Sequence, residues 1–291
     1  MLKIWIDAAR PKTLAAAVVP VLIGMALALR EHLFNPVMSL VAFICAILIQ
    51  IGTNFANDYF DAKKGADSDN RIGFERATAS GLITPGQMLG ATCITMGLAF
   101  LLGLVLVWHA GWVILLIGVL SLIFGIAYTG GPFPLGYNGL GDVFVFLFFG
   151  IVAVMGTYYV NALHWSSLAF WSSIPAGALS VNILVINNLR DIETDKPAGK
   201  KTLGVIFGEN VLRYEYLLML LLSFAIPPHL FIRDNFGPFI FLPLLSIPLA
   251  VRLLKKIWYV KDKRTLNKTL AHTAQFLVIF GVLFSLGLVL S

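Results

Sequence analysis

Nine apolar runs follow one another along this chain of 291 residues, and each is long enough to cross a bilayer as a helix. A transmembrane helix needs about 17–25 predominantly apolar residues. Runs of this length lie near residues 13–29, 38–56, 88–107, 112–129, 142–160, 168–187, 211–232, 238–254 and 271–290. The pattern predicts an all-α, polytopic membrane protein with nine transmembrane helices, built as a single membrane-embedded domain over residues 1–291.

Basic residues gather on one side of the predicted helix bundle. If the N-terminus is cytoplasmic, every Lys and Arg among the 21 except Arg30 and Arg233 falls in a cytoplasmic segment. Such an excess of positive charge is typical of the cytoplasmic loops of membrane proteins. The distribution therefore predicts a multi-pass membrane protein with the N-terminus in the cytoplasm and the C-terminus outside. We expect it to lie in the bacterial cytoplasmic (inner) membrane.

The composition of the chain agrees with a lipid bilayer as its solvent. Hydrophobic residues make up 58% and charged residues 12% of the sequence, and the mean hydropathy is +0.86. A soluble domain, by contrast, carries about 25% charged residues. The formal net charge of +6 is explained by the cytoplasmic face and needs no nucleic-acid partner, although it also suits anionic lipids or ligands.

Two short acidic clusters interrupt the apolar pattern where the second and sixth predicted spans end. They are Asn54-Phe-Ala-Asn-Asp-Tyr-Phe-Asp61, continuing to Asp67 and Asp69, and Asn187-Asn-Leu-Arg-Asp191-Ile-Glu-Thr-Asp195. Carboxylates at a membrane boundary are costly to desolvate unless they are paired, hydrated or bound to a metal. Two clusters that each carry their own asparagines predict one shared cation site.

Helical spacing brings the acids of each cluster onto one face of a helix. Side chains three, four or seven positions apart share a side, which groups Asn54 with Asp58 and Asp61, and Asn187 with Asp191 and Asp195. Two such faces turned toward each other would form an all-oxygen pocket. Oxygen ligands suit Mg²⁺, which usually keeps several waters and is completed by substrate phosphates. We expect this pocket in a central cavity that opens near the cytoplasmic face.

Basic side chains crowd the two loops that follow the clusters: Lys63, Lys64, Arg71, Arg76, Arg190, Lys196, Lys200 and Lys201. A carboxylate–Mg²⁺–phosphate bridge flanked by Lys and Arg is a usual way to hold a diphosphate. A diphosphate at the mouth of a membrane cavity implies a substrate with an apolar remainder, and a polyprenyl diphosphate fits. Aromatic rings would shield its allylic cation from water. The candidates are Tyr59, Phe60, Tyr128, Phe133, Tyr137, Tyr158 and Tyr159.

Two other interpretations of the clusters remain open at this point. The acids could be structural and form salt bridges with the Lys and Arg of their own loops. They could also couple ion or proton movement in a transporter. Transporter sites, however, usually lie near the bilayer midplane, often at helices broken by Gly or Pro, whereas these acids sit at the cytoplasmic ends of their spans.

The two clusters resemble the aspartate motifs of the UbiA-type membrane prenyltransferases. Other segments are similar to the branch of that family that prenylates 1,4-dihydroxy-2-naphthoate in menaquinone biosynthesis, and they are spread over almost the whole chain. They include Ala9-Arg-Pro-Lys-Thr-Leu14, Tyr128-Thr-Gly-Gly-Pro132 and Gly199-Lys-Lys-Thr-Leu203. One departure is the Asp191-x-x-x-Asp195 spacing, where Asp-x-x-Asp is common elsewhere in the family, and it leaves the pairing of ligands with metals open.

The resemblance implies a nine-helix enzyme that uses Mg²⁺ to transfer a polyprenyl group from its diphosphate to 1,4-dihydroxy-2-naphthoate, with loss of CO₂ and diphosphate, giving demethylmenaquinol. It implies metal binding and catalysis by Asp58, Asp61, Asp191 and Asp195. Diphosphate binding is implied for Asn54, Asn57, Arg76, Asn188, Arg190, Lys196 and Lys201, and acceptor binding for Arg10, Lys12, Tyr128 and Tyr137. Another acceptor, such as 4-hydroxybenzoate or a haem precursor, is the alternative within the same family.

Overall fold

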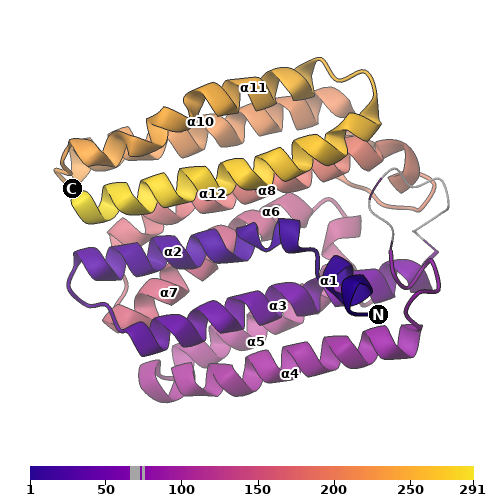
Figure 1. Ribbon diagram of the computed structural model, residues 1–291, viewed down its shortest axis with the longest axis horizontal. Helices are drawn as coiled ribbons and strands as arrows, with labels where there is room; N and C mark the ends of the chain where they lie inside the picture. Colours follow the sequence, from indigo (N-terminus) through magenta and orange to yellow (C-terminus); the bar gives the residue numbers. More distant parts are fainter. Residues whose placement is uncertain (66–72, 74–75) are drawn as a thin grey trace.

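The computed structural model describes the chain except for residues 66–72 and 74–75 and the side chain of Lys12. All regular secondary structure in the described part is helical, which confirms the expected all-α class. Figure 1 shows the long helices side by side along one axis, with the two termini at opposite ends. The α-helices are α1 (Leu2–Ala9), α2 (Ala15–Arg30), α3 (Pro36–Lys63), α4 (Pro85–Ala110), α5 (Trp112–Ala127), α6 (Gly141–Phe146), α7 (Ala153–Ala162), α8 (Ser167–Asp195), α9 (Leu203–Phe207), α10 (Glu209–Arg233), α11 (Ile247–Trp258) and α12 (Leu266–Leu290).

Seven helical segments of the described chain are long and apolar enough to cross a membrane. They coincide with seven of the nine predicted spans. The other two spans correspond to α2 and α5, which have 16 residues each. A helix of that length is about 24 Å long, somewhat shorter than the hydrocarbon core of about 30 Å. The structure therefore supports a multi-pass membrane protein without establishing a count of nine.

Two of the long helices, α3 and α4, begin where the sequence supplies side-chain acceptors for their first, unpaired N–H donors. Asn35 accepts hydrogen bonds from the backbone N–H groups of Val37 and Met38 at the start of α3. Thr84 and Gln87 form a reciprocal capping box at the start of α4. Such caps satisfy donors that the helix itself leaves free, so the loops end at defined positions.

The central helix of the bundle is α8. In the most apolar stretch of α8, 78% of the residues are buried inside the protein, compared with 22% in the corresponding stretches of α3 and α4. It packs against α10, α12, α6 and α7, while α2 lies between α3 and α12 (Figure 1). In Figure 1, α3 and α8 run in the same direction, so their acidic ends lie at the same end of the molecule.

A close glycine contact holds the wall of the bundle against α8. The segment between α6 and α7 is a π-helical turn, Leu147–Val152, a feature found frequently at functional sites. A Cβ on Gly150 of this turn would lie 2.8 Å from the Cα of Gly177 in α8. Two facing glycines allow this backbone approach, as small residues commonly do in membrane helix packing.

Gly150→Ala is expected to destabilise the protein by about 1–3 kcal/mol, because the added methyl group overpacks a contact between two backbones. The melting temperature of purified protein in detergent measures the effect. Gly97→Ala on the exposed side of α4 is the matched control, since a Cβ added there would have nothing within 4 Å, and alanine favours a helix over glycine. Equal melting temperatures for the two variants would contradict this view of the contact.

Candidate active site

A cavity of about 400 Å³ lies between α3, α4, α5, α7 and α8. At one end it is lined by the acidic ends of α3 and α8, through Asp61, Asp191 and Asp195. The lining at the other end is apolar and includes Leu106 and Ile114. The cavity therefore joins a charged mouth to a hydrophobic interior, which suits a ligand with a polar head and an apolar tail.

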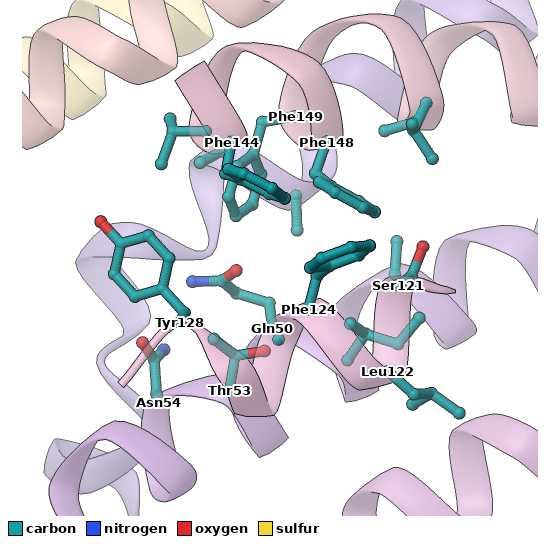
Figure 2. A pocket seen from close by; sticks show the side chains of 18 of the residues that line it. Gln50, Thr53, Asn54, Ser121, Leu122, Phe124, Tyr128, Phe144, Phe148 and Phe149 are labelled. Atoms are coloured by element: carbon teal, nitrogen blue, oxygen red, sulfur yellow. The ribbon is translucent and has the colours of Figure 1, made fainter. Parts of the chain in front are cut away.

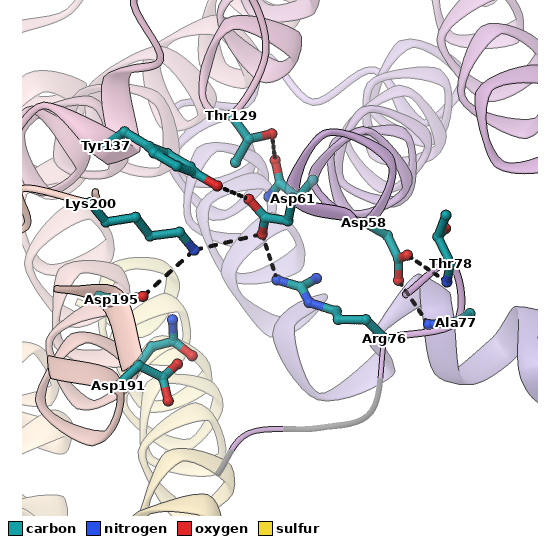
Figure 3. A network of polar contacts seen from close by, with 12 residues as sticks. Asp58, Asp61, Arg76, Ala77, Thr78, Thr129, Tyr137, Asp191, Asp195 and Lys200 are labelled. Atoms are coloured by element: carbon teal, nitrogen blue, oxygen red, sulfur yellow. Dashed lines mark hydrogen bonds and ion pairs between the residues drawn. The ribbon is translucent and has the colours of Figure 1, made fainter. Parts of the chain in front are cut away.

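Asp61 is the centre of the polar network at the mouth (Figure 3). Its side chain is almost fully buried, and the Tyr137 hydroxyl donates a hydrogen bond of 2.7 Å to its Oδ1. The Arg76 guanidinium lies 3.1 Å from Oδ2 of the same carboxylate. These partners offset the desolvation of a charge held among apolar helices.

Lys200 connects the two acidic helix ends. Its Nζ lies 3.8 Å from Oδ2 of Asp61 and 3.6 Å from Oδ1 of Asp195 (Figure 3). The carboxylates of α3 and α8 are thus within reach of a single cation. Because Asp61 and Asp195 come from the two separate clusters, the structure brings the ends of both clusters to one place.

The residues at the mouth fit a magnesium ion. The Lys200 ammonium occupies a position between two carboxylates, and the side chains of Asn57 and Asn188 line the cavity beside them. Within the described residues, no three His, Cys, Asp or Glu side chains form a metal-binding group. Mg²⁺ is commonly held by one or two carboxylates together with waters and substrate phosphates, which is the kind of donor set that Asp61 and Asp195 offer.

Asp58 lies differently from the other aspartate of its motif. Its Oδ1 accepts a hydrogen bond of 2.9 Å from the backbone N–H of Thr78, and its Oδ2 accepts one of 3.2 Å from Ala77. In Figure 3 its carboxylate points away from that of Asp61, and it is not among the described residues that line the cavity. Asp58 anchors the turn that carries Arg76.

Asp191 is paired with its own neighbour. The Arg190 guanidinium donates from Nε and Nη2 to the two oxygens of Asp191, and it also donates to Asn187 and to Asn267. Arg190 is only 1% exposed, so each of these bonds helps to compensate a buried positive charge. Asp191 lines the cavity, whereas Arg190 lies behind it.

The expected acceptor-binding residues divide into two groups. Arg10, Tyr128 and Tyr137 line the cavity, while the side chain of Lys12 lies outside the described part of the chain. Arg10 follows α1 with a φ of 53°, a left-handed conformation that is uncommon outside glycine. Asn54, predicted to bind diphosphate, lines the cavity, and its Nδ2 donates to the carbonyl of Ala9 at 2.9 Å, which holds the backbone next to Arg10.

The remaining predicted cations are peripheral. Lys196 and Lys201 are exposed and are not among the lining residues that the structure describes. The backbone N–H of Lys201 donates to the carbonyl of Tyr137 at 2.8 Å, which fixes the loop. The neighbouring Lys200, predicted from the sequence as a loop cation but not assigned to diphosphate binding, reaches the carboxylates of Asp61 and Asp195.

Two lysines and a threonine complete the mouth. Nζ of Lys64 lies 4.4 Å and Nζ of Lys200 lies 4.9 Å from the centre of the Tyr137 ring, which is cation–π distance. Lys64 also donates to the carbonyl of Thr129, whose hydroxyl donates to Asn57. Partial burial lowers the pKa of Lys64, and the nearby Asp61 carboxylate opposes that shift. The sequence indicated Lys64 only as one of several loop cations, whereas Thr129 and Lys200 lie in two of the segments that resemble the family.

Aromatic rings form one wall of the interior (Figure 2). The Phe124 ring centre is 4.9 Å from that of Phe144 and 5.5 Å from that of Phe148, and Phe149 lines the same region. Of the aromatic residues expected from the sequence, Tyr128 and Tyr137 line the cavity. Those outside the described lining are Tyr59, Phe60, Phe133, Tyr158 and Tyr159.

Asp58→Asn should raise the hydrogen-exchange rates of the Ala77 and Thr78 amides by about 10-fold, because a hydrogen bond to a charged group contributes about 1.5–3 kcal/mol and 1.4 kcal/mol is a factor of ten. Exchange followed by mass spectrometry in detergent measures this. Asp195→Asn is the matched control, because its carboxylate faces Lys200 from the other helix. A similar increase in both variants would show that Asp58 does not anchor the turn.

Comparison with known proteins identifies the family of this chain. The sequence matches the UbiA prenyltransferase family over residues 17–280. The 1,4-dihydroxy-2-naphthoate octaprenyltransferase of Escherichia coli (strain K12) is 38% identical over 296 residues, covering 99% of this chain and 95% of that protein. The protein of the same name from Mycobacterium tuberculosis is 36% identical over 279 residues, covering 96% of this chain and 94% of its own length.

Solved structures with the same fold are more distant in sequence. The apo structure of a UbiA homolog from Aeropyrum pernix K1 has a TM-score of 0.71 and 14% identity, covering 92% of this chain and 96% of its own. A UbiA homolog from Archaeoglobus fulgidus bound to DMAPP and Mg²⁺ has a TM-score of 0.66 and 13% identity, covering 97% of this chain and 99% of its own. With its family match, its similarity to these relatives and its fold, this chain belongs to the UbiA prenyltransferase family.

Proposed function

We propose that this protein transfers a polyprenyl group from its diphosphate to 1,4-dihydroxy-2-naphthoate in a Mg²⁺-dependent reaction that releases CO₂ and diphosphate. The observation that carries the proposal is the approach of Asp61 and Asp195 to one cation at the mouth of an apolar cavity. The names of the relatives that are 33–38% identical support the choice of acceptor. A solved UbiA homolog bound to DMAPP and Mg²⁺ supports the choice of metal and donor.

We assign metal binding to the carboxylates that face the cavity, Asp61, Asp191 and Asp195. Mg²⁺ there would act as a Lewis acid that neutralises charge on the departing diphosphate. Lys200 and Arg76 lie next to Asp61 and are placed to contact the phosphate oxygens, and Asn57 and Asn188 can donate amide hydrogen bonds. Asp58 and Arg190 position these groups through the turn at Thr78 and through Asp191.

The prenyl chain occupies the apolar interior in this proposal, with its reactive carbon just inside the mouth. The electron-rich ring of the acceptor attacks that carbon from the position that bears the carboxylate, and CO₂ then leaves. Arg10 lines the cavity and can pair with the acceptor carboxylate. The faces of the Phe124 and Phe144 rings, which exclude water, would stabilise positive charge on the allylic group.

We also propose that α2 and α5 cross the bilayer, which gives nine spans with the N-terminus in the cytoplasm. Two observations support this proposal. Both helices run alongside the longer helices (Figure 1), and the two termini lie at opposite ends of the bundle, as an odd number of spans requires. The concentration of Lys and Arg in the loops on the N-terminal side supports the inner membrane and this orientation.

Removal of the metal or of a carboxylate that faces the cavity is expected to abolish transfer. In membranes that contain the wild-type protein, EDTA should stop prenylation and added Mg²⁺ should restore it. Asp61→Asn and Asp195→Asn should each lower the rate by about 100-fold or more, because the metal and the diphosphate lose a ligand. Product formation from radiolabelled polyprenyl diphosphate is the readout. Full activity in EDTA would refute a Mg²⁺-dependent reaction.

The topology is tested with reporter fusions. Alkaline phosphatase, which is active only outside the cytoplasm, should be active when fused after Leu33 and after Ser291, and inactive when fused after Lys196. The fusion at Leu33 decides whether α2 crosses, because that residue lies just beyond the end of the helix. An inactive fusion at Leu33 with an active one at Ser291 would require an odd number of spans between them, which leaves the seven long helices and removes both α2 and α5 from the spans.

A further inference from the structure

Two polar side chains lie deep in the cavity, well below the charged mouth. Gln50 in α3 is eleven residues before Asp61, and Ser180 in α8 is eleven residues before Asp191. Both line the cavity and are 8% and 3% exposed. At 1.5 Å per residue each lies about 16 Å along its helix from the aspartate. The polar faces of α3 and α8 therefore continue into the apolar interior at matching depth.

The surroundings of Gln50 are mostly aromatic. Figure 2 shows its amide extending into the cavity between the rings of Tyr128 and Phe124, on the side that faces Phe144 and Phe149. No described residue forms a hydrogen bond with this amide, and the Ser180 hydroxyl is buried without a hydrogen-bond partner in the described part of the chain. These groups have hydrogen-bonding capacity that the protein itself leaves unused.

An amide that faces an apolar cavity without a hydrogen-bond partner is unfavourable. A prenyl tail is a hydrocarbon and provides neither a donor nor an acceptor, so it would leave the Gln50 amide unpaired. A ligand with a polar atom at this depth would satisfy it. The Gln amide both donates and accepts, which matches a ring hydroxyl, a group with the same dual capacity.

Asn54 connects the position of Gln50 in α3 with that of Arg10. Asn54 is one helical turn beyond Gln50, about 6 Å along α3, and its amide holds the carbonyl of Ala9 next to Arg10. Arg10 and Gln50 both line the cavity, and Asn54, one turn of α3 from Gln50, contacts the residue that precedes Arg10. A naphthoate that carries a carboxylate on carbon 2 and a hydroxyl on carbon 4 of the same ring presents the two groups meta to each other, so one ring can contact both side chains.

We propose that Gln50 binds the acceptor hydroxyl at ring carbon 4, which is remote from the carboxylate, while Arg10 binds the carboxylate itself. This inference rests on the proposed function, since it assumes a dihydroxynaphthoate acceptor. It assigns to Gln50 the selection of dihydroxy over monohydroxy acceptors and a share in orienting the ring. The aromatic wall at Phe124 and Phe144 packs against the ring face.

The test compares two acceptors in the wild type and in Gln50→Leu. The wild type should prefer 1,4-dihydroxy-2-naphthoate over 1-hydroxy-2-naphthoate, measured by kcat/KM for the first and by its competitive inhibition constant for the second. In Gln50→Leu this preference should fall by about 10-fold, the loss of one hydrogen bond, while the KM for polyprenyl diphosphate stays unchanged. Gln275→Leu is the matched control, because Gln275 is exposed on α12, and it should retain the wild-type preference.

Each other outcome overturns the inference. An equal loss for both acceptors would mean that Gln50 supports packing, and a higher KM for polyprenyl diphosphate alone would place Gln50 along the path of the tail. Gln50→Met, which keeps the length of the side chain, replaces Gln50→Leu if the latter does not fold. A wild-type enzyme that fails to prenylate the dihydroxynaphthoate refutes the proposed function. Normal wild-type activity with an unchanged preference in the variant refutes only the role of Gln50.

Discussion

The approach of the Asp61 and Asp195 carboxylates to one another, at the boundary of an apolar helix bundle, is the constraint on which the rest of the structure depends. Two negative charges in a poorly hydrated place repel each other and lose solvation energy unless cations accompany them. Lys200 lies between them, and Arg76 and the Tyr137 hydroxyl complete the shell of Asp61. Arg76 and Lys200, which follow α3 and α8 in the chain, are thereby brought together at the mouth of the cavity. A site that is stable with a lysine between its carboxylates is also prepared for a divalent cation with phosphate.

Behind this mouth, the burial of α8 decides the shape of the cavity. Small residues let neighbouring helices approach α8 closely, as Gly177 does for Gly150, so one side of the bundle is densely packed. The space remains on the other side, between α3, α5 and the π-helical turn, where large phenylalanine rings line it. The same arrangement explains how a charged reaction centre and a hydrocarbon ligand share one cavity, because the polar groups follow two helix faces while the walls between them are apolar.

Much of the fold could be predicted from local pattern. The predicted spans coincide with helices, because hydrophobicity over about twenty residues is a property of the segment alone. Helical periodicity also identified the acidic faces that meet at the mouth. It failed to separate Asp58 from Asp61, since residues three apart differ by about 60° around the helix. That difference turns one carboxylate to the cavity and the other to the backbone of Ala77 and Thr78. Periodicity also could not tell that Lys200 rather than Lys201 reaches the carboxylates, because this depends on how the loop lies against Tyr137.

The sequence by itself determined the helical class, the membrane environment, the two aspartate clusters and the family resemblance, all of which follow from the order of residues within short segments. Only the tertiary structure decided which side chains share the cavity. The Phe124 and Phe144 wall, the Lys200 bridge and the amide of Gln50 belong to elements far apart in the chain. Their relation depends on the distances and angles at which helices pack, and packing geometry is set by many side chains together rather than by any one segment.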